Sequence, residues 1–281
     1  MFLPQFLETS FGLIPNIVLF SFLGLFVLKH TYRYVEQTYA EANKKPLFLN
    51  FVLIPKKLTN EQILVLEKRF QFYNQLNSKE QDIFKHRLAT FISDKSFYGR
   101  EDLVVTEEMK VLVSATAIML TFGFKNYTLP IIKTILIYPR PFYSKINEQL
   151  HKGEVNPMLG VIAFSWEDFK HGYDIKNDNL NLGIHEFGHA LHLNSYKSND
   201  VSALIFGETF KDLKRYLKAN DYKREQLINT KYFRAYAYTN EFEFVAVLVE
   251  CFFETPNEFK STFPNIYDKV KEMLNFNFAG Y

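Results

Sequence analysis

The chain has 281 residues, with 33 Lys+Arg against 31 Asp+Glu, 47% hydrophobic residues and a formal net charge of +2. This size and apolar content allow one large domain or two small ones, and they exclude a disordered chain and a disulfide scaffold. The near-neutral charge and the scattered basic residues argue against a nucleic-acid-binding surface. Cys251, the single cysteine, cannot form an intramolecular disulfide, which fits a reducing compartment.

The first predicted element is an apolar helix. Residues 11–28 carry no charge and approach the shortest length that can span a hydrocarbon core of ~30 Å. Lys29, His30 and Arg33 follow this run directly, so the positive-inside rule places its C-terminal side in the cytoplasm. We therefore expect a single-pass anchor in a bacterial inner membrane.

Two alternatives remain for this segment. Pro15 and Asn16 limit the uninterrupted apolar part to residues 17–28, a length typical of a signal-peptide core. However, no Lys or Arg precedes the run and no small-residue cleavage site follows it. The other alternative is a buried or interfacial helix of a soluble cytoplasmic protein.

The rest of the chain contains no repeat and no Pro/Gly/Ser-rich linker, so we expect residues 1–44 to be anchor and connector and residues 45–281 to be one domain. Apolar residues at helical spacing predict a helix pair within residues 60–92 and another helix from Thr106 to Gly123. Branched and aromatic residues predict two strands, 134–138 and 161–166. Later helices are expected around residues 182–193, 204–217, 241–253 and 264–274. The predicted class is α+β, mostly helical with a small β-sheet.

The predicted helix 182–193 contains the pattern H-E-x-x-H as His185, Glu186 and His189. Residues four apart lie one turn above each other on a helix, so both imidazoles can reach one zinc ion at ~2.1 Å. Glu186 lies one step round from the first ligand and can accept a proton from a water molecule on the metal. A zinc-dependent hydrolase is therefore expected, and a chance match would lack the apolar helical context.

A catalytic zinc ion needs a third protein ligand. His192 is near in sequence, but it is roughly 10 Å along the helix axis from His185, which would strain a tetrahedral site. A metzincin would require Gly at position 192 and His at 195, where this chain has His192 and Ser195. The helix 241–253 offers Glu243 and Glu250 on one face, and one of these two should be the ligand.

These motifs resemble a known family. The run from Tyr236 to Ala246, taken with H-E-x-x-H, is similar to the catalytic core shared by the Mlc titration factor A family of zinc peptidases and the anthrax lethal factor protease domain. Further matching stretches are residues 97–109, 135–139, 160–166 and 243–253. The resemblance covers roughly residues 71–276 and implies a zincin-like fold with a lethal-factor-like core.

The resemblance also implies roles for individual residues. His185, His189 and Glu243 would be the zinc ligands, in a gluzincin-like set, and Glu186 the general base. Tyr236 matches a family tyrosine that hydrogen-bonds the oxyanion, although by itself it would be read as a packing residue. For Glu250 two roles stay open. It either orients a ligand histidine or is a helix-face carboxylate paired to a lysine.

The chain departs from the family pattern at several places. His192 replaces a usual Asp, Gly153 and Glu154 are all that remains of a Gly-Glu-Ala-Trp-like stretch, and residues 195–200 replace an Asp-Gly pair. The family's best-known member binds the transcriptional repressor Mlc, and we do not transfer that partner on this resemblance.

The expected function is that of a zinc metallopeptidase, either an aminopeptidase or an endopeptidase, acting on a peptide or protein substrate. The strand 161–166 is expected at a sheet edge, where it could pair with an extended substrate. The alternatives are a zinc hydrolase of non-peptide bonds and a zinc-containing regulatory protein that sequesters a transcriptional regulator.

Overall fold

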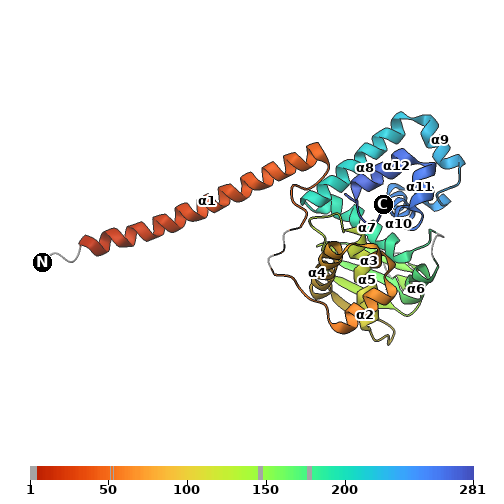
Figure 1. Ribbon diagram of the computed structural model, residues 1–281, viewed down its shortest axis with the longest axis horizontal. Coiled ribbons are helices and arrows are strands. Elements are labelled where there is room, and N and C mark those ends of the chain that lie inside the picture. Colours follow the sequence, from red (N-terminus) through yellow and green to blue (C-terminus); the bar gives the residue numbers. More distant parts are fainter. Residues whose placement is uncertain (1–4, 51, 53, 145–147, 176–178) are drawn as a thin grey trace.

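The computed structural model describes residues 5–50, 52, 54–144, 148–175 and 179–281, with side chains described from residue 16 onward. Most of this structure is helical and it contains two small sheets, in agreement with the predicted α+β class (Figure 1).

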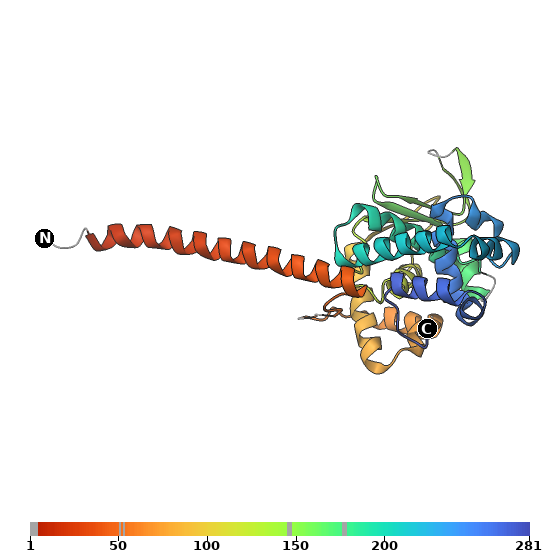
Figure 2. The same ribbon diagram turned by 90° about the horizontal axis from the view of Figure 1, so that it is seen from above.

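Helix α1 (Gln5–Asn43) projects from the rest of the molecule as a long rod, and only its C-terminal end touches the domain (Figures 1 and 2). At this end Nζ of Lys125 lies 2.5 Å from the buried carboxylate of Glu36. Ala40 packs against helix α8 (Val201–Ala219). The contact therefore combines one ion pair with a small apolar cluster.

The predicted transmembrane anchor is not supported. Its first residues, 11–15, lie outside the part of the chain whose side chains are described. Among the described residues, no helix is both long enough and apolar enough to cross a membrane. The uninterrupted apolar stretch, 17–28, gives about 18 Å of helix at ~1.5 Å per residue, which is shorter than a hydrocarbon core of ~30 Å.

The helix pair predicted over residues 60–92 is a run of three helices, α2 (Asn60–Arg69), α3 (Gln71–Gln75) and α4 (Ser78–Asp94). Thr59 and Asn77 begin α2 and α4 with capping boxes, which satisfy backbone N–H groups of the first turn.

Helix α5 (Glu107–Leu120) confirms the helix predicted after Thr106 and forms the centre of the core. Its residues from Val111 to Leu120 are all buried, and it contacts α2, α4 and α7. From Val111 onward it carries no charged residue, as expected for a helix enclosed by other elements.

The larger sheet has the strand order β1-β2-β6-β5. Strands β1 (Ser96–Gly99), β2 (Thr134–Tyr138) and β6 (Val161–Ser165) are parallel, and β5 (Gly153–Asn156) is antiparallel to β6. The prediction that β6 lies at the edge is therefore wrong, because β5 covers it. The short, polar β5 has no apolar alternation that could have predicted it.

Three further elements lie between β2 and α7 in the chain. Strands β3 (Phe142–Ser144) and β4 (Gln149–His151) form a separate antiparallel pair. Helix α6 (Trp166–Asp174) begins where β6 ends, so the strand predicted to include Trp166 stops one residue earlier.

The remaining helices form the C-terminal part of the molecule, with α7 at its centre. They are α7 (Leu182–Lys197), α9 (Asp221–Asn229), the 3-10 helix η1 (Ala235–Tyr238), α10 (Glu241–Glu254), α11 (Pro256–Thr262) and α12 (Pro264–Met273). Helix α7 contacts α5, α8, α10 and strand β5. It thereby joins the sheet to the C-terminal helices.

Candidate metal centre

Helix α7 carries the H-E-x-x-H residues at the middle of the molecule. Asn181 caps its first turn, since its side-chain oxygen accepts from the N–H of Ile184 at 3.0 Å. The rings of His185 and His189 follow one turn apart, with centroids separated by 4.5 Å. Both imidazoles therefore lie on the same side of α7, as the spacing predicts.

Helix α10 brings the third member of the cluster. Asn240 caps α10 by accepting from the N–H of Glu243 at 3.0 Å, so this carboxylate belongs to the first turn. Oε2 of Glu243 lies 3.2 Å from Nε2 of His185 and 3.5 Å from Nε2 of His189. One ligand atom from each of the three residues falls within 4.8 Å of the others, so the cluster could hold a metal ion.

The donor set fits a divalent metal. Oε2 of Glu243 is buried, and it makes no hydrogen bond of good geometry within the described part of the chain although two imidazole nitrogens face it. Burial raises the pKa of Glu243, but the close approach of His185 and His189 outweighs it and holds this pKa well below its usual range. Burial lowers the pKa of His189, which favours the neutral imidazole that metals bind.

Glu250, the other carboxylate considered on α10, lies outside the three-residue cluster. Its side chain is only 1% exposed and lies behind the cluster, where Oε2 is 3.0 Å from Nδ1 of His185. The backbone N–H of Asn181 donates to its Oε1 at 3.0 Å, and Arg234 forms an ion pair with Oε2. Glu250 therefore faces the far nitrogen of His185, and its cationic partner is an arginine rather than a lysine.

This contact orients His185. With a metal bound, Nδ1–H would donate to Glu250 and leave the lone pair of Nε2 for the metal. Without a metal, burial lowers the pKa of His185, but the two glutamates outweigh it and raise the pKa to about 10, so a metal ion has to displace the proton on Nε2.

Glu186 lies next to the cluster and is only 6% exposed. Burial raises the pKa of its carboxyl to about 8, against the lowering effect of His185. Its side chain contacts strand β5 at Gly153. A carboxyl that gains and loses a proton near neutral pH is suited to proton transfer.

Tyr236 lies on η1, directly before α10, and its ring centroid is 6.4 Å from that of His185. The side chain is 53% exposed, which argues against the alternative reading as a core residue. Burial of part of the ring and the charge of Glu243 raise the pKa of the phenol to about 12, so the hydroxyl stays protonated and able to donate.

A cavity of about 210 Å³ opens beside the cluster. His185, Tyr236, Arg234 and Glu250 form one side of it, and Leu180 and Leu182 with Lys152, Asp168 and His171 complete its lining. The cavity therefore gives a small molecule or a side chain access to His185 and Tyr236.

His192 does not belong to the cluster. Its Nε2 lies 3.2 Å from the hydroxyl of Tyr196, and its ring packs edge-on against Phe210. Burial lowers its pKa to about 4, so the imidazole is neutral. His192 lies about one turn beyond His189 on α7, and this position agrees with the geometric argument against His192 as the third ligand.

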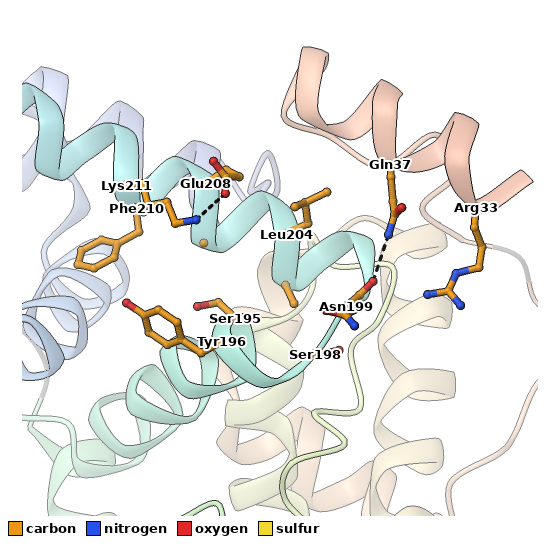
Figure 3. Close-up of a pocket in the computed structure, with 12 residues that line it drawn as sticks. Arg33, Gln37, Ser195, Tyr196, Ser198, Asn199, Leu204, Glu208, Phe210 and Lys211 are labelled. Atoms are coloured by element: carbon orange, nitrogen blue, oxygen red, sulfur yellow. Dashed lines mark hydrogen bonds and ion pairs between the residues drawn. The ribbon is translucent and has the colours of Figure 1, made fainter. Parts of the chain in front are cut away.

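A second cavity, of about 370 Å³, lies where α1 meets the end of α7 and α8 (Figure 3). Arg33 and Gln37 reach it from α1, and the side chain of Gln37 donates to the carbonyl of Asn199 at 3.5 Å. None of the three cluster residues lines this cavity.

Sequence reasoning missed three residues that position the cluster. Gly153 contacts Glu186, and Arg234 forms an ion pair with Glu250. Phe242 stacks on His189 with ring centroids 3.7 Å apart. A local sequence pattern could not identify these contacts, because each one joins two elements that are distant in the sequence.

Known proteins are similar to this chain over most of its length. The model of the family described as glucose-regulated metallo-peptidase M90 matches residues 50–274. The chain is 27% identical over 234 residues to an uncharacterized protein of Synechocystis sp., covering 74% of this chain and 81% of that protein. It is 25% identical over 207 residues to the Mlc titration factor A proteins of Yersinia pestis and Yersinia pseudotuberculosis, covering 68% of this chain and 76% of each relative. The chain therefore belongs to the glucose-regulated metallo-peptidase M90 family.

Proposed function

We propose that this protein is a zinc-dependent metallopeptidase whose peptidase domain is formed by residues 45–281. Zinc would be held by His185, His189 and Glu243, because two imidazoles and a carboxylate match the donor set of a catalytic zinc site. The observation that carries the proposal is the convergence of these three side chains from α7 and α10 beside the buried Glu186.

When bound, zinc would polarise the scissile carbonyl and lower the pKa of a water molecule. Glu186 accepts the proton of the attacking water and then passes it to the leaving amine. The neighbouring helix position of Glu186 places its carboxylate next to both histidines, and burial keeps its proton affinity high. This residue is therefore the general base and then the general acid.

Tyr236 would donate a hydrogen bond to the oxyanion that forms on the substrate carbonyl. Its exposed side chain and its position beside His185 on the lining of the cavity support this role. Strand β5 is the edge strand of the larger sheet and contacts α7, so an extended peptide could pair with it in the way that we first expected for β6.

A second candidate function is regulatory. Relatives at 25% identity carry the name Mlc titration factor A, which names a protein that titrates Mlc. In this alternative the chain keeps its metal and sequesters a transcriptional regulator, with weak or no peptidase activity. The buried Glu186 beside the cluster favours catalysis, since a purely structural site has no need of a base.

The deciding experiment is a peptide-library assay of the zinc-loaded protein, with the Glu186→Gln variant as control. We expect cleavage by the wild type and a loss of about 10²–10⁴-fold in kcat in the variant, while both retain stoichiometric zinc. Peptides with blocked N-termini separate an endopeptidase from an aminopeptidase, and ester substrates test a non-peptide hydrolase. Equal turnover by wild type and variant would refute the role of Glu186.

A further inference from the structure

The first residue of strand β5, Gly153, lies directly against the side chain of Glu186. A Cβ atom placed on Gly153 would be 2.5 Å from Cγ, 2.6 Å from Oε1 and 2.7 Å from Cδ of Glu186. Nonbonded carbon atoms prefer separations of about 3.5–4.0 Å. The Glu186 side chain therefore occupies the space that any side chain at position 153 would need.

Strand β5 is held in place at this point. Gly153 is paired with Phe164 of β6, and the N–H of Ser165 donates to the carbonyl of Lys152 at 2.6 Å. Nζ of Lys152 also lies 2.6 Å from Asp168 on α6. Because Phe164 is fully buried, the strand that carries these partners is itself fixed to the core.

Helix α7 is equally constrained. A Cβ atom on Gly188 would lie 3.1 Å from Cα of Ala246, so α7 and α10 already approach as closely as two backbones can. At the start of α7, a Cβ atom on Gly183 would lie 2.5 Å from the ring of Phe169. The helix has no free space on either of these sides.

We propose that Gly153 is a positioning residue for the general base, because its missing side chain leaves the space in which the Glu186 carboxylate stands. With β5 and α7 both fixed, only the Glu186 side chain can yield when a Cβ is added. A methyl group at position 153 would then rotate the carboxylate away from the metal ligands without moving them. This inference rests on the proposed function, in which Glu186 is the base.

The first test compares Gly153→Ala with wild type in the zinc-loaded protein. We expect kcat to fall by about 10²-fold or more, within the range of a lost general base, while KM, zinc affinity and Tm stay close to wild type. Gly207→Ala is the matched control, because a Cβ there meets nothing closer than 3.5 Å, and its kinetics should be unchanged. Unchanged kcat in Gly153→Ala, or loss of zinc together with activity, would overturn the proposal.

The second test uses Glu186→Ala, which removes Cγ, Cδ and Oε1, the three atoms that a Cβ at position 153 would meet. In this background Gly153→Ala should change kcat by less than about threefold, whereas two independent effects would multiply. If Gly153→Ala lowers kcat in this background as much as it does in the wild type, Gly153 does not act through Glu186.

A crystal structure of Gly153→Ala supplies a readout that needs no activity. We expect the Glu186 carboxylate to be displaced, with β5 and α7 unmoved; a shifted strand would contradict the proposal. If the wild-type protein cleaves no peptide, the proposed function fails, and this crystal structure still decides whether Gly153 sets the position of Glu186.

Discussion

Nδ1 of His185 lies 3.0 Å from Oε2 of Glu250, whereas Nε2 of the same ring lies 3.2 Å from Oε2 of Glu243. One imidazole thus separates two glutamates that share a face of α10. Nδ1 faces Glu250, which supports the ring, and Nε2 faces Glu243, which belongs to the cluster. This arrangement predicts different effects for the two glutamates.

Glu243→Ala should weaken zinc binding far more than Glu250→Ala. The first variant removes a ligand, whereas the second removes a partner that orients His185 and should cost about 10–100-fold in affinity. Competition with a chromophoric chelator measures both. Glu241→Ala is the matched control, because Glu241 is an exposed residue of α10 that forms an ion pair with Lys214. A larger loss in Glu250→Ala would assign the third ligand to Glu250.

Arg234→Met should lower zinc affinity by about tenfold, because Glu250 loses the cation that holds it against His185. Arg234→Lys should recover part of the loss. The visible spectrum of the cobalt-substituted protein provides a second readout, since it reports ligand geometry directly. Arg224→Met, which breaks an exposed ion pair with Asp221, should change neither measurement. If Arg234→Met keeps the zinc affinity of the wild type, Arg234 does not support the metal site.

The metal-free protein should become less stable, relative to Glu186→Gln, as pH rises from about 5 to about 8. The pKa of Glu186 is raised from 4.5 to about 8 in the folded protein, so folding favours the protonated form. This contribution is fully present below about pH 4.5 and is lost as pH rises through about 8. Thermal melts of both proteins across this range measure the difference in Tm. A difference that stays constant with pH would contradict the raised pKa.

Phe187→Ala should reduce the free energy of unfolding by about 3–5 kcal/mol. Phe187 is fully buried and its ring lies 5.6 Å from that of Phe164 and 6.4 Å from that of Phe91, so α7 loses its contacts with β6 and α4. Urea denaturation measures the change. Phe48→Ala, at a side chain that is 60% exposed, should cost much less, and equal losses would show that burial does not set the effect.

The helices predicted at the positions of α5, α7 and α10 were confirmed. Strands β2 and β6 were also recognised from their branched and aromatic residues. The order of the strands in the sheet was not predicted, because β5 contains a glycine and polar residues and is held by its pairing with β6. Strand pairing depends on partners distant in sequence, which a local pattern does not contain.

The sequence by itself determined the part of the candidate metal centre that lies on α7. The period of a helix places His185 and His189 on one face whatever surrounds them, and Glu186 follows from the same helix. Only the tertiary structure shows which glutamate joins these two histidines, since Glu243 and Glu250 both lie on one face of α10 and the packing of α10 against α7 sets which one faces Nε2 of His185. The roles of Gly153 and Arg234 depend likewise on how β5 and η1 pack against α7 and α10.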